Sequence, residues 1–152
     1  MITKMYDPLF NKPSELIIEG ELQGNDKLRI KMLEDVSLMT PETKHQILNA
    51  MLKMHKYFED YCGDLDISLN TINEIATNTQ PLYIILDDTS TMETRAIRYH
   101  YSCNWETDHG VEVMVLNGNQ VIFVGNCGYT YGVLLTSIDS ALSLQDEELN
   151  FL

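Results

Sequence analysis

A hairpin signal in the second half of the chain constrains the fold more than any other feature. Valines alternate with other side chains over residues 111–116, and an apolar run follows over residues 121–124. Asn117 and Gly118 lie between the two runs, and both residue types accept the positive φ angles of a tight two-residue turn. This pattern predicts two neighbouring antiparallel strands.

Further strands are predicted from shorter patterns. Residues 93–103 have a period of two, with aromatic and apolar positions on one side and polar positions on the other. Residues 82–86 form a compact apolar run bounded by turn-forming residues, which is typical of a buried strand. Residues 16–22 and 27–33 flank Gly24-Asn25-Asp26, and the second run alternates apolar with basic side chains. We therefore expect these two runs to form a hairpin with one face in water.

Thr40, Pro41 and Glu42 predict the start of a long helix. The threonine hydroxyl caps free amides, proline lacks a donor that would be unpaired there, and the carboxylate faces the positive end of the helix dipole. Gly63 favours a left-handed stop. Between these points a broad apolar face recurs at steps of three and four residues: Ile47, Leu48, Met51, Leu52, His55, Phe58 and Tyr61.

We therefore predict an α+β fold: an antiparallel, meander-like sheet with one long packed helix and a short C-terminal helix. The polar segment 64–80 is expected to contain a short helix, and the acidic segment 137–149 is expected to form the terminal one. Residues 1–152 have the length and apolar content of one domain, with residues 133–152 as a C-terminal helical extension.

Charge narrows the choice of partner. The formal net charge is −13, and all ten lysines and arginines lie at or before Arg98. Nucleic acid is not expected as a ligand, because binding to phosphates requires clustered basic side chains. A protein partner with a basic surface is favoured instead, since a strong negative field speeds the encounter. No run of about 18 apolar residues predicts a membrane span. We expect a cytoplasmic protein without a membrane partner.

The most distinctive segment is Trp105-Glu106-Thr107-Asp108-His109-Gly110, which contains the only tryptophan. Glu106, Asp108 and His109 are residue types that serve acid–base catalysis or hold a metal, so one alternative is a small metal-dependent hydrolase. The other interpretation is a turn lock, in which the indole covers the edge of the core and Gly110 adopts a backbone conformation that side chains resist. We prefer the turn lock, because no catalytic partner from another element is identifiable.

The three cysteines, Cys62, Cys103 and Cys127, are widely spaced and are interpreted as reduced, packed thiols. Cys103, His109 and Cys127 match no zinc-binding spacing. Cys127 as a nucleophile, with His100 or His109 as its base, lacks a neighbouring Lys or Arg that would activate the thiol. The chain also lacks a phosphate-binding loop and the common hydrolase motifs. We therefore predict no catalytic residues, no metal and no cofactor.

Tyr99 with Tyr101 and Tyr129 with Tyr131 form alternate-residue pairs typical of one sheet face. Such tyrosines either cover a half-buried sheet or contribute to a partner surface. The candidate partner-binding residues are Trp105, Glu106, Asp108, His109, Glu112, Tyr129 and Tyr131.

Three motifs together resemble a known family. These are Asp7-Pro8-Leu9-Phe10, the helix start at Thr40-Pro41-Glu42, and the Trp-acid-x-acid-His-Gly element at residues 105–110. They are similar to a family of small acidic bacterial domains of unknown function, and the similarity extends over residues 6–125. The resemblance implies occurrence among candidate immunity proteins of toxin systems, and it implies no catalytic residues.

The leading hypothesis is a non-enzymatic, immunity-type protein-binding domain that occludes the basic surface of a toxin or enzyme. The acidic C-terminal third would steer the encounter, and aromatic anchors such as Trp105 or Tyr131 would be buried at the contact. Two alternatives stay open. One is the small metal-dependent hydrolase, and the other is a structural domain that associates with a second copy of itself through an edge strand or a tyrosine face.

Overall fold

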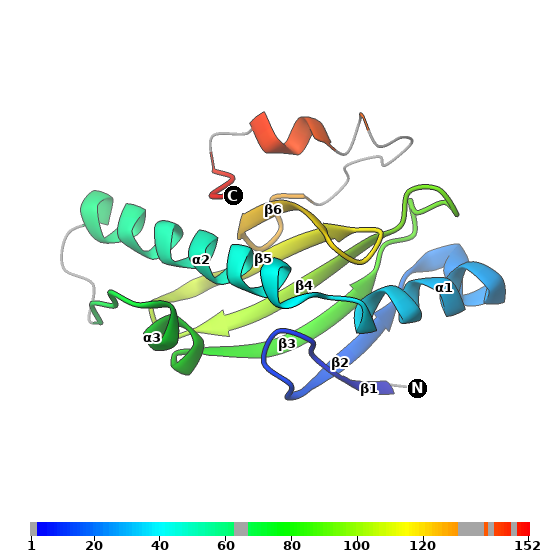
Figure 1. Cartoon of the computed structure of the whole chain (residues 1–152), viewed down its shortest axis with the longest axis horizontal. Coiled ribbons are helices and arrows are strands. Elements are labelled where there is room, and N and C mark those ends of the chain that lie inside the picture. The colour runs from blue at the N-terminus through cyan, green and yellow to red at the C-terminus, as the bar shows by residue number, and fades with distance from the viewer. Residues whose placement is uncertain (1–2, 63–66, 131–138, 140–141, 147–148) are drawn as a thin grey trace.

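One six-stranded sheet runs through the described part of the chain, with the three α-helices on one side of it (Figure 1). The structure is a computed structural model that describes residues 3–62, 67–130, 139, 142–146 and 149–152, and at residues 62, 106–108, 145 and 146 the description is limited to the backbone. The strands are β1 (Thr3–Tyr6), β2 (Pro13–Ile18), β3 (Thr79–Leu86), β4 (Ala96–Cys103), β5 (Glu106–Leu116) and β6 (Gln120–Asn126).

The strands lie side by side in chain order. Every neighbouring pair is antiparallel except β2 and β3, which are parallel. A parallel pair requires a long crossover connection, and the helical segment between these strands supplies it. It contains a short 3-10 helix (Gly20–Gly24), α1 (Asp26–Ser37), α2 (Pro41–Cys62) and α3 (Ile72–Thr77). The α+β class is therefore confirmed, while the predicted meander is interrupted once, between β2 and β3.

The predicted hairpin of residues 16–22 and 27–33 is wrong, because its second half is the helix α1. The Asn25 side chain caps this helix by accepting a hydrogen bond from the Leu28 backbone nitrogen at 3.2 Å. The alternation of apolar and basic residues fits a strand, but the same segment also has apolar side chains at every fourth position. These side chains lie on one face of the helix, and their burial in the core favours the helix over a strand: Leu28, Met32 and Val36.

The long helix α2 begins where it was predicted. The hydroxyl of Thr40 accepts a hydrogen bond from the Thr43 backbone nitrogen at 3.2 Å, as expected of a capping residue. The predicted short helix within residues 64–80 is α3. All three α-helices lie on the same side of the sheet (Figure 1). No helix within the described residues combines the length and apolar character of a membrane span.

The turn between β5 and β6 also holds the start of α2. Asn117 and Gly118 have φ angles of 50° and 92°, which confirms the predicted tight turn. The next residue, Asn119, accepts a hydrogen bond from the Thr40 backbone nitrogen and donates one to the Leu38 carbonyl, each at 2.9 Å. The hairpin therefore fixes the junction between α1 and α2 as well as its own strands.

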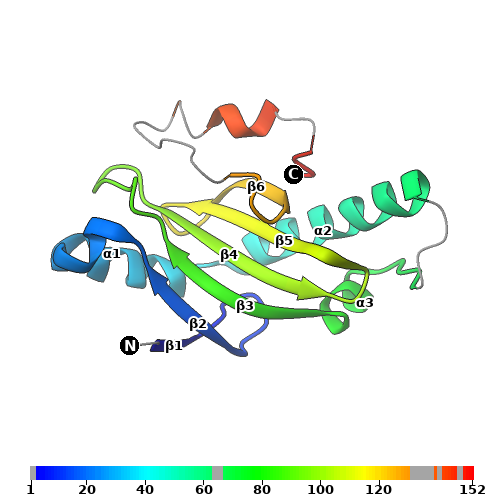
Figure 2. The same cartoon turned by 180° about the vertical axis from the view of Figure 1, so that it is seen from behind.

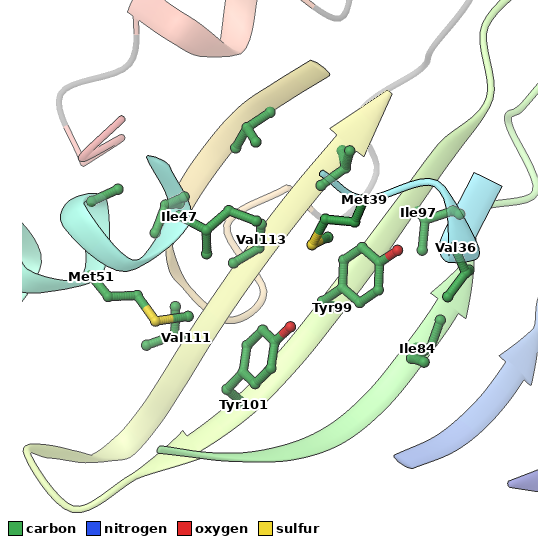
Figure 3. Packing of buried hydrophobic residues seen from close by; sticks show 14 of the residues in the cluster. Val36, Met39, Ile47, Met51, Ile84, Ile97, Tyr99, Tyr101, Val111 and Val113 are labelled. Carbon is green, nitrogen blue, oxygen red and sulfur yellow. The ribbon is translucent and has the colours of Figure 1, made fainter. Parts of the chain in front are cut away.

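The main core lies between the helices and the sheet (Figure 3). Alternate residues of the central strands point toward it, including Tyr99 and Tyr101, which are each only 1% exposed. The predicted tyrosine face of residues 99 and 101 is therefore core. The helices and the junction between α1 and α2 contribute side chains that face these strands: Val36, Met39, Ile47 and Met51.

The Asp7 motif closes one end of this core. Asp7 Oδ2 accepts a hydrogen bond from the Phe10 backbone nitrogen and Asp7 Oδ1 accepts one from the Tyr101 hydroxyl, each at 2.8 Å. Burial raises the pKa of Asp7 above its usual range, against the lowering effect of these bonds. The Asp-Pro-Leu-Phe segment is thus a structural lock between the β1–β2 connection and β4.

The opposite side of the sheet carries no helix over β2, β3 and β4 within the described residues (Figure 2). We call this side the open face, and by strand register it presents Glu15, Ile17, Tyr83, Ile85, Arg98, His100 and Ser102. On the β5–β6 side, Leu144 packs with Met114 and Phe123. Of the predicted terminal helix, residues 143–146 form a 3-10 turn, and most of the remainder lies outside the described residues.

Candidate functional site

The Trp105 segment is mostly strand rather than loop. β4 ends at Cys103 and β5 begins at Glu106, so the connection consists of two residues. Trp105 is 3% exposed, and its indole nitrogen donates a hydrogen bond to Thr79 Oγ1 at 3.3 Å. Its ring meets the His55 ring of α2 edge to face, with centroids 5.7 Å apart. Trp105 therefore joins the strand connection to the helix layer and does not lie on the surface.

Gly110 has the positive φ expected of it. Its φ is +71°, and an added Cβ would lie 2.5 Å from the Tyr101 carbonyl oxygen. Of the other predicted residues here, His109 is exposed. The side chains of Glu106 and Asp108 lie outside the described part of the structure. The predicted centre of Glu106, Asp108 and His109 therefore also lies outside it.

A buried ionic network lies at the centre of the open face. Arg98 projects from the middle of β4 with 7% of its side chain exposed. Its Nη2 lies 2.6 Å from Glu19 Oε1, its Nε 3.1 Å from Asp87 Oδ2, and its Nη1 3.6 Å from Glu112 Oε1. Glu19 follows β2, Asp87 follows β3, and Glu112 belongs to β5. One guanidinium group thus joins acidic side chains from three separate segments.

Glu112 is the member of this network that extends it to a histidine. Its side chain is fully buried, and Oε1 lies 2.7 Å from His100 Nε2, while Oε2 accepts a hydrogen bond from the Thr130 hydroxyl at 2.5 Å. Burial by itself would raise the pKa of Glu112. The hydrogen bonds from His100 and Thr130, together with the charge of Arg98, outweigh it and lower the pKa below its usual value. Glu112 is therefore ionised at neutral pH and orients His100.

A pocket of about 460 Å³ lies beside this network at the end of the open face. Gly110 of β5 is one of the residues that line it, and a Cβ added there would lie 3.6 Å from Cys127 Sγ. The neighbouring side chains form its walls: Tyr83, His100, Ser102, Asn104, His109 and Cys127. The Tyr83 and His100 rings meet nearly edge to face, with centroids 6.3 Å apart and an interplanar angle of 75°. None of the residues that line the pocket is a lysine or an arginine.

This pocket brings together the residues considered for a thiol nucleophile. Cys127, His100 and His109 all line it, from three different segments. However, the Nε2 atom of His100 lies 2.7 Å from Glu112, so this nitrogen is directed at the carboxylate. The sequence did not predict this shared pocket, because Cys127 is distant along the chain from both histidines.

Among the described residues, three metal-ligand atoms come within 4.8 Å of one another only at Glu19, Asp87 and Asp88. Glu19 and Asp87 already bind the guanidinium of Arg98, which supplies the positive charge there. Cys103, His109 and Cys127 form no such group. Cys103 belongs to the buried cluster on the helix side of the sheet.

Tyr129, another predicted contact residue, follows the end of β6. Tyr129 is 39% exposed, and its ring stacks on Phe123 with centroids 5.5 Å apart. Tyr131 lies outside the described residues. Sequence reasoning missed the roles of Arg98 and Tyr83. One signal was present, because Arg98 stands at the centre of a strand whose other central positions are apolar or aromatic.

Comparison with known proteins adds a family but no function. A family model described as "Domain of unknown function (DUF6985)" matches residues 2–131. No curated protein and no solved structure matches the chain.

Proposed function

The chain belongs to this family of unknown function, and we propose that it is a non-enzymatic binding domain whose open face docks a protein with a basic surface. The observation that carries the proposal is the open face itself. Three large apolar side chains are exposed there or at its border: Ile17 at 39%, Tyr83 at 36% and Leu82 at 42%. Exposed apolar and aromatic groups inside a polar surround are typical of protein contact surfaces.

Charge complementarity supports a basic partner. The open face and its rim hold five carboxylates: Glu15, Glu19, Asp87, Asp88 and Glu112. Three cations accompany them. Arg98 is buried and paired, and Lys4 lies on the edge strand beside Glu15. Lys12 donates a hydrogen bond to Gln80, which lies opposite Ser102. The whole chain carries a net charge of −13. Such a field attracts a positively charged surface and raises the association rate at low salt.

The ionic network suits this role because it makes the face rigid. Arg98 links the ends of β2 and β3 to β5, and Glu112 links β5 to Thr130. A surface that is already ordered loses little conformational entropy when a partner binds. An immunity-type protein that occludes a basic toxin or enzyme needs such a surface, and this is the biological role that we propose for the domain. The contact relies on Tyr83 and Ile17 rather than on the buried Trp105.

The proposal is tested by affinity capture followed by quantitative binding. The purified chain, immobilised at low salt, is expected to retain a basic protein from the source cell. The dissociation constant of the purified pair is then measured across a salt series. We expect the affinity to fall steeply as salt rises, since screening weakens contacts between opposite charges. A neutral or acidic partner, or an affinity that is independent of salt, would overturn the proposal.

Self-association is the competing result of the same experiment. β1 is one of the two edge strands of the sheet and offers unpaired backbone groups to a second copy. Light scattering on the purified chain distinguishes the two cases. We expect a monomer that becomes a heteromeric complex, and a stable dimer that buries the open face would contradict the proposed function.

A further inference from the structure

We infer that the pocket beside the ionic network, bordered by Tyr83, His100, Ser102 and Asn104, receives an arginine side chain of the protein partner. The inference rests on the proposed function and specifies the anchor at its contact surface. Interfaces draw most of their affinity from a few side chains that insert into pockets, and arginine is one of the residue types most enriched among them.

The shape and walls of the pocket suit a flat cation. Its volume is about 460 Å³, and two aromatic rings, Tyr83 and His100, form one side. Tyr83 remains 36% exposed, so part of its ring is open to a ligand. A guanidinium group stacks on aromatic faces, where the ring quadrupole attracts its charge.

Hydrogen-bond acceptors complete the match. The Ser102 hydroxyl lies on the pocket wall. Asn104 is a second wall residue, and its amide nitrogen donates to Asn78 Oδ1 at 3.3 Å, which directs the amide oxygen of Asn104 away from that bond. Arginine has five donors in a planar fork and can bind several acceptors at once, whereas lysine presents its donors from a single point.

Electrostatics favour a cation and disfavour an anion here. No residue lining the pocket is a lysine or an arginine, and the nearest guanidinium, that of Arg98, is buried among Glu19, Asp87 and Glu112. The ionised Glu112 lies directly behind His100 at 2.7 Å. Position 98 is also the last basic residue of the chain, so the segments that follow add only negative charge.

The pocket is tested without the partner, using the full chain and a small probe. N-acetyl-arginine methylamide is titrated into the isotope-labelled protein and followed by amide NMR shifts. Its citrulline counterpart, which has the same shape but no charge, is the matched ligand. We expect saturable shifts centred on residues 100–104 and 109–110, with the citrulline probe at least about fivefold weaker. Equal affinity for both probes, or shifts that centre elsewhere, would overturn the inference.

Matched variants assign the binding to the pocket walls. Tyr83→Leu removes the ring and is expected to weaken arginine binding about fivefold. Tyr61→Leu is the control, because Tyr61 is 79% exposed on α2, on the opposite side of the sheet. Ser102→Phe fills the pocket from an exposed position and is expected to abolish binding. If these two pocket variants bind the probe like the parent chain, the inference is wrong.

The inference and the proposed function can fail separately. If the probe does not bind in the pocket but a charge-changing substitution at Ile17 still prevents partner binding, the open face binds a partner without an arginine anchor. If the probe binds in the pocket while that substitution leaves partner binding unchanged, the arginine site exists and the proposed docking surface is wrong.

Discussion

Replacement of Arg98 by methionine tests the physical account of the open face. Methionine keeps most of the apolar stem but removes the guanidinium, which leaves three acidic groups without their shared cation. Among these, the Glu112 side chain is fully buried and Asp87 is 9% exposed, while Glu19 is 28% exposed and can reach water. The lost stabilisation therefore comes mainly from the two buried carboxylates.

The expected magnitude follows from burial. Removal of one partner from a buried ion pair costs about 3–5 kcal/mol, since the remaining charge stays poorly solvated. Glu112 keeps its hydrogen bonds with His100 and Thr130, and Asp87 keeps those from Thr89, but both lose the guanidinium. Small domains have a total stability of about 5–15 kcal/mol. We therefore expect Arg98→Met to lower the free energy of unfolding by about 3–5 kcal/mol, which brings the protein close to its folding limit.

Urea unfolding followed by Trp105 fluorescence measures this loss, because the indole is 3% exposed in the folded chain. Arg29→Met is the matched control. Its Nη2 also lies 2.6 Å from a carboxylate, that of Asp26, but the two side chains are 25% and 76% exposed. Exposed pairs contribute about 0–1 kcal/mol. If Arg98→Met costs no more than Arg29→Met, the network does not stabilise the sheet and the reasoning is refuted.

Three further predictions concern single residues. Folding lowers the pKa of Glu112 from 4.5, so its stabilising effect is present above that pH and is lost as the pH falls through the folded-state value. Glu112→Gln should lower the free energy of unfolding by about 1.5–3 kcal/mol at neutral pH and flatten its decline in acid, as measured by urea unfolding at several pH values.

Folding raises the pKa of Asp7 from 3.8, so its contribution is full below that pH and is lost as the pH rises through the folded-state value. Asp7→Asn should leave neutral-pH stability unchanged or higher by on the order of 1 kcal/mol, and a clear loss in the same assay would contradict this. Gly110→Ala should cost at least about 2 kcal/mol in thermal unfolding, because the φ of +71° opposes a side chain, whereas Gly24→Ala has open space and should cost less.

Local patterns were sufficient for two elements of the fold. The turn at Asn117 and Gly118 and the start of α2 at Thr40 depend on neighbours in the chain, and both were predicted correctly. The segment that became α1 was predicted as a strand, because its apolar side chains satisfy a period of two as well as a period of four. Only burial against the sheet distinguishes the helix from the strand, and burial depends on the whole fold.

The candidate site was less predictable, because its members meet only in three dimensions. Arg98 binds Glu19 from 79 positions away, and no spacing rule connects them. Trp105 drew attention as the only tryptophan, yet it is buried, while Tyr83 and Ile17 on the open face carry no distinctive motif. A sequence shows which residue types are rare in the chain, but exposure decides which of them can contact a partner.

The central claim is that the open face binds a basic partner, and the affinity of two isoleucine variants tests it most directly. Ile17 is 39% exposed on the open face, and Ile30 is 56% exposed on α1, on the opposite side of the sheet. Titration calorimetry with the captured partner should show that Ile17→Lys binds at least about tenfold more weakly, because a positive charge then opposes a basic surface. Ile30→Lys should bind like the parent chain. Equal affinities for the two variants would contradict the account.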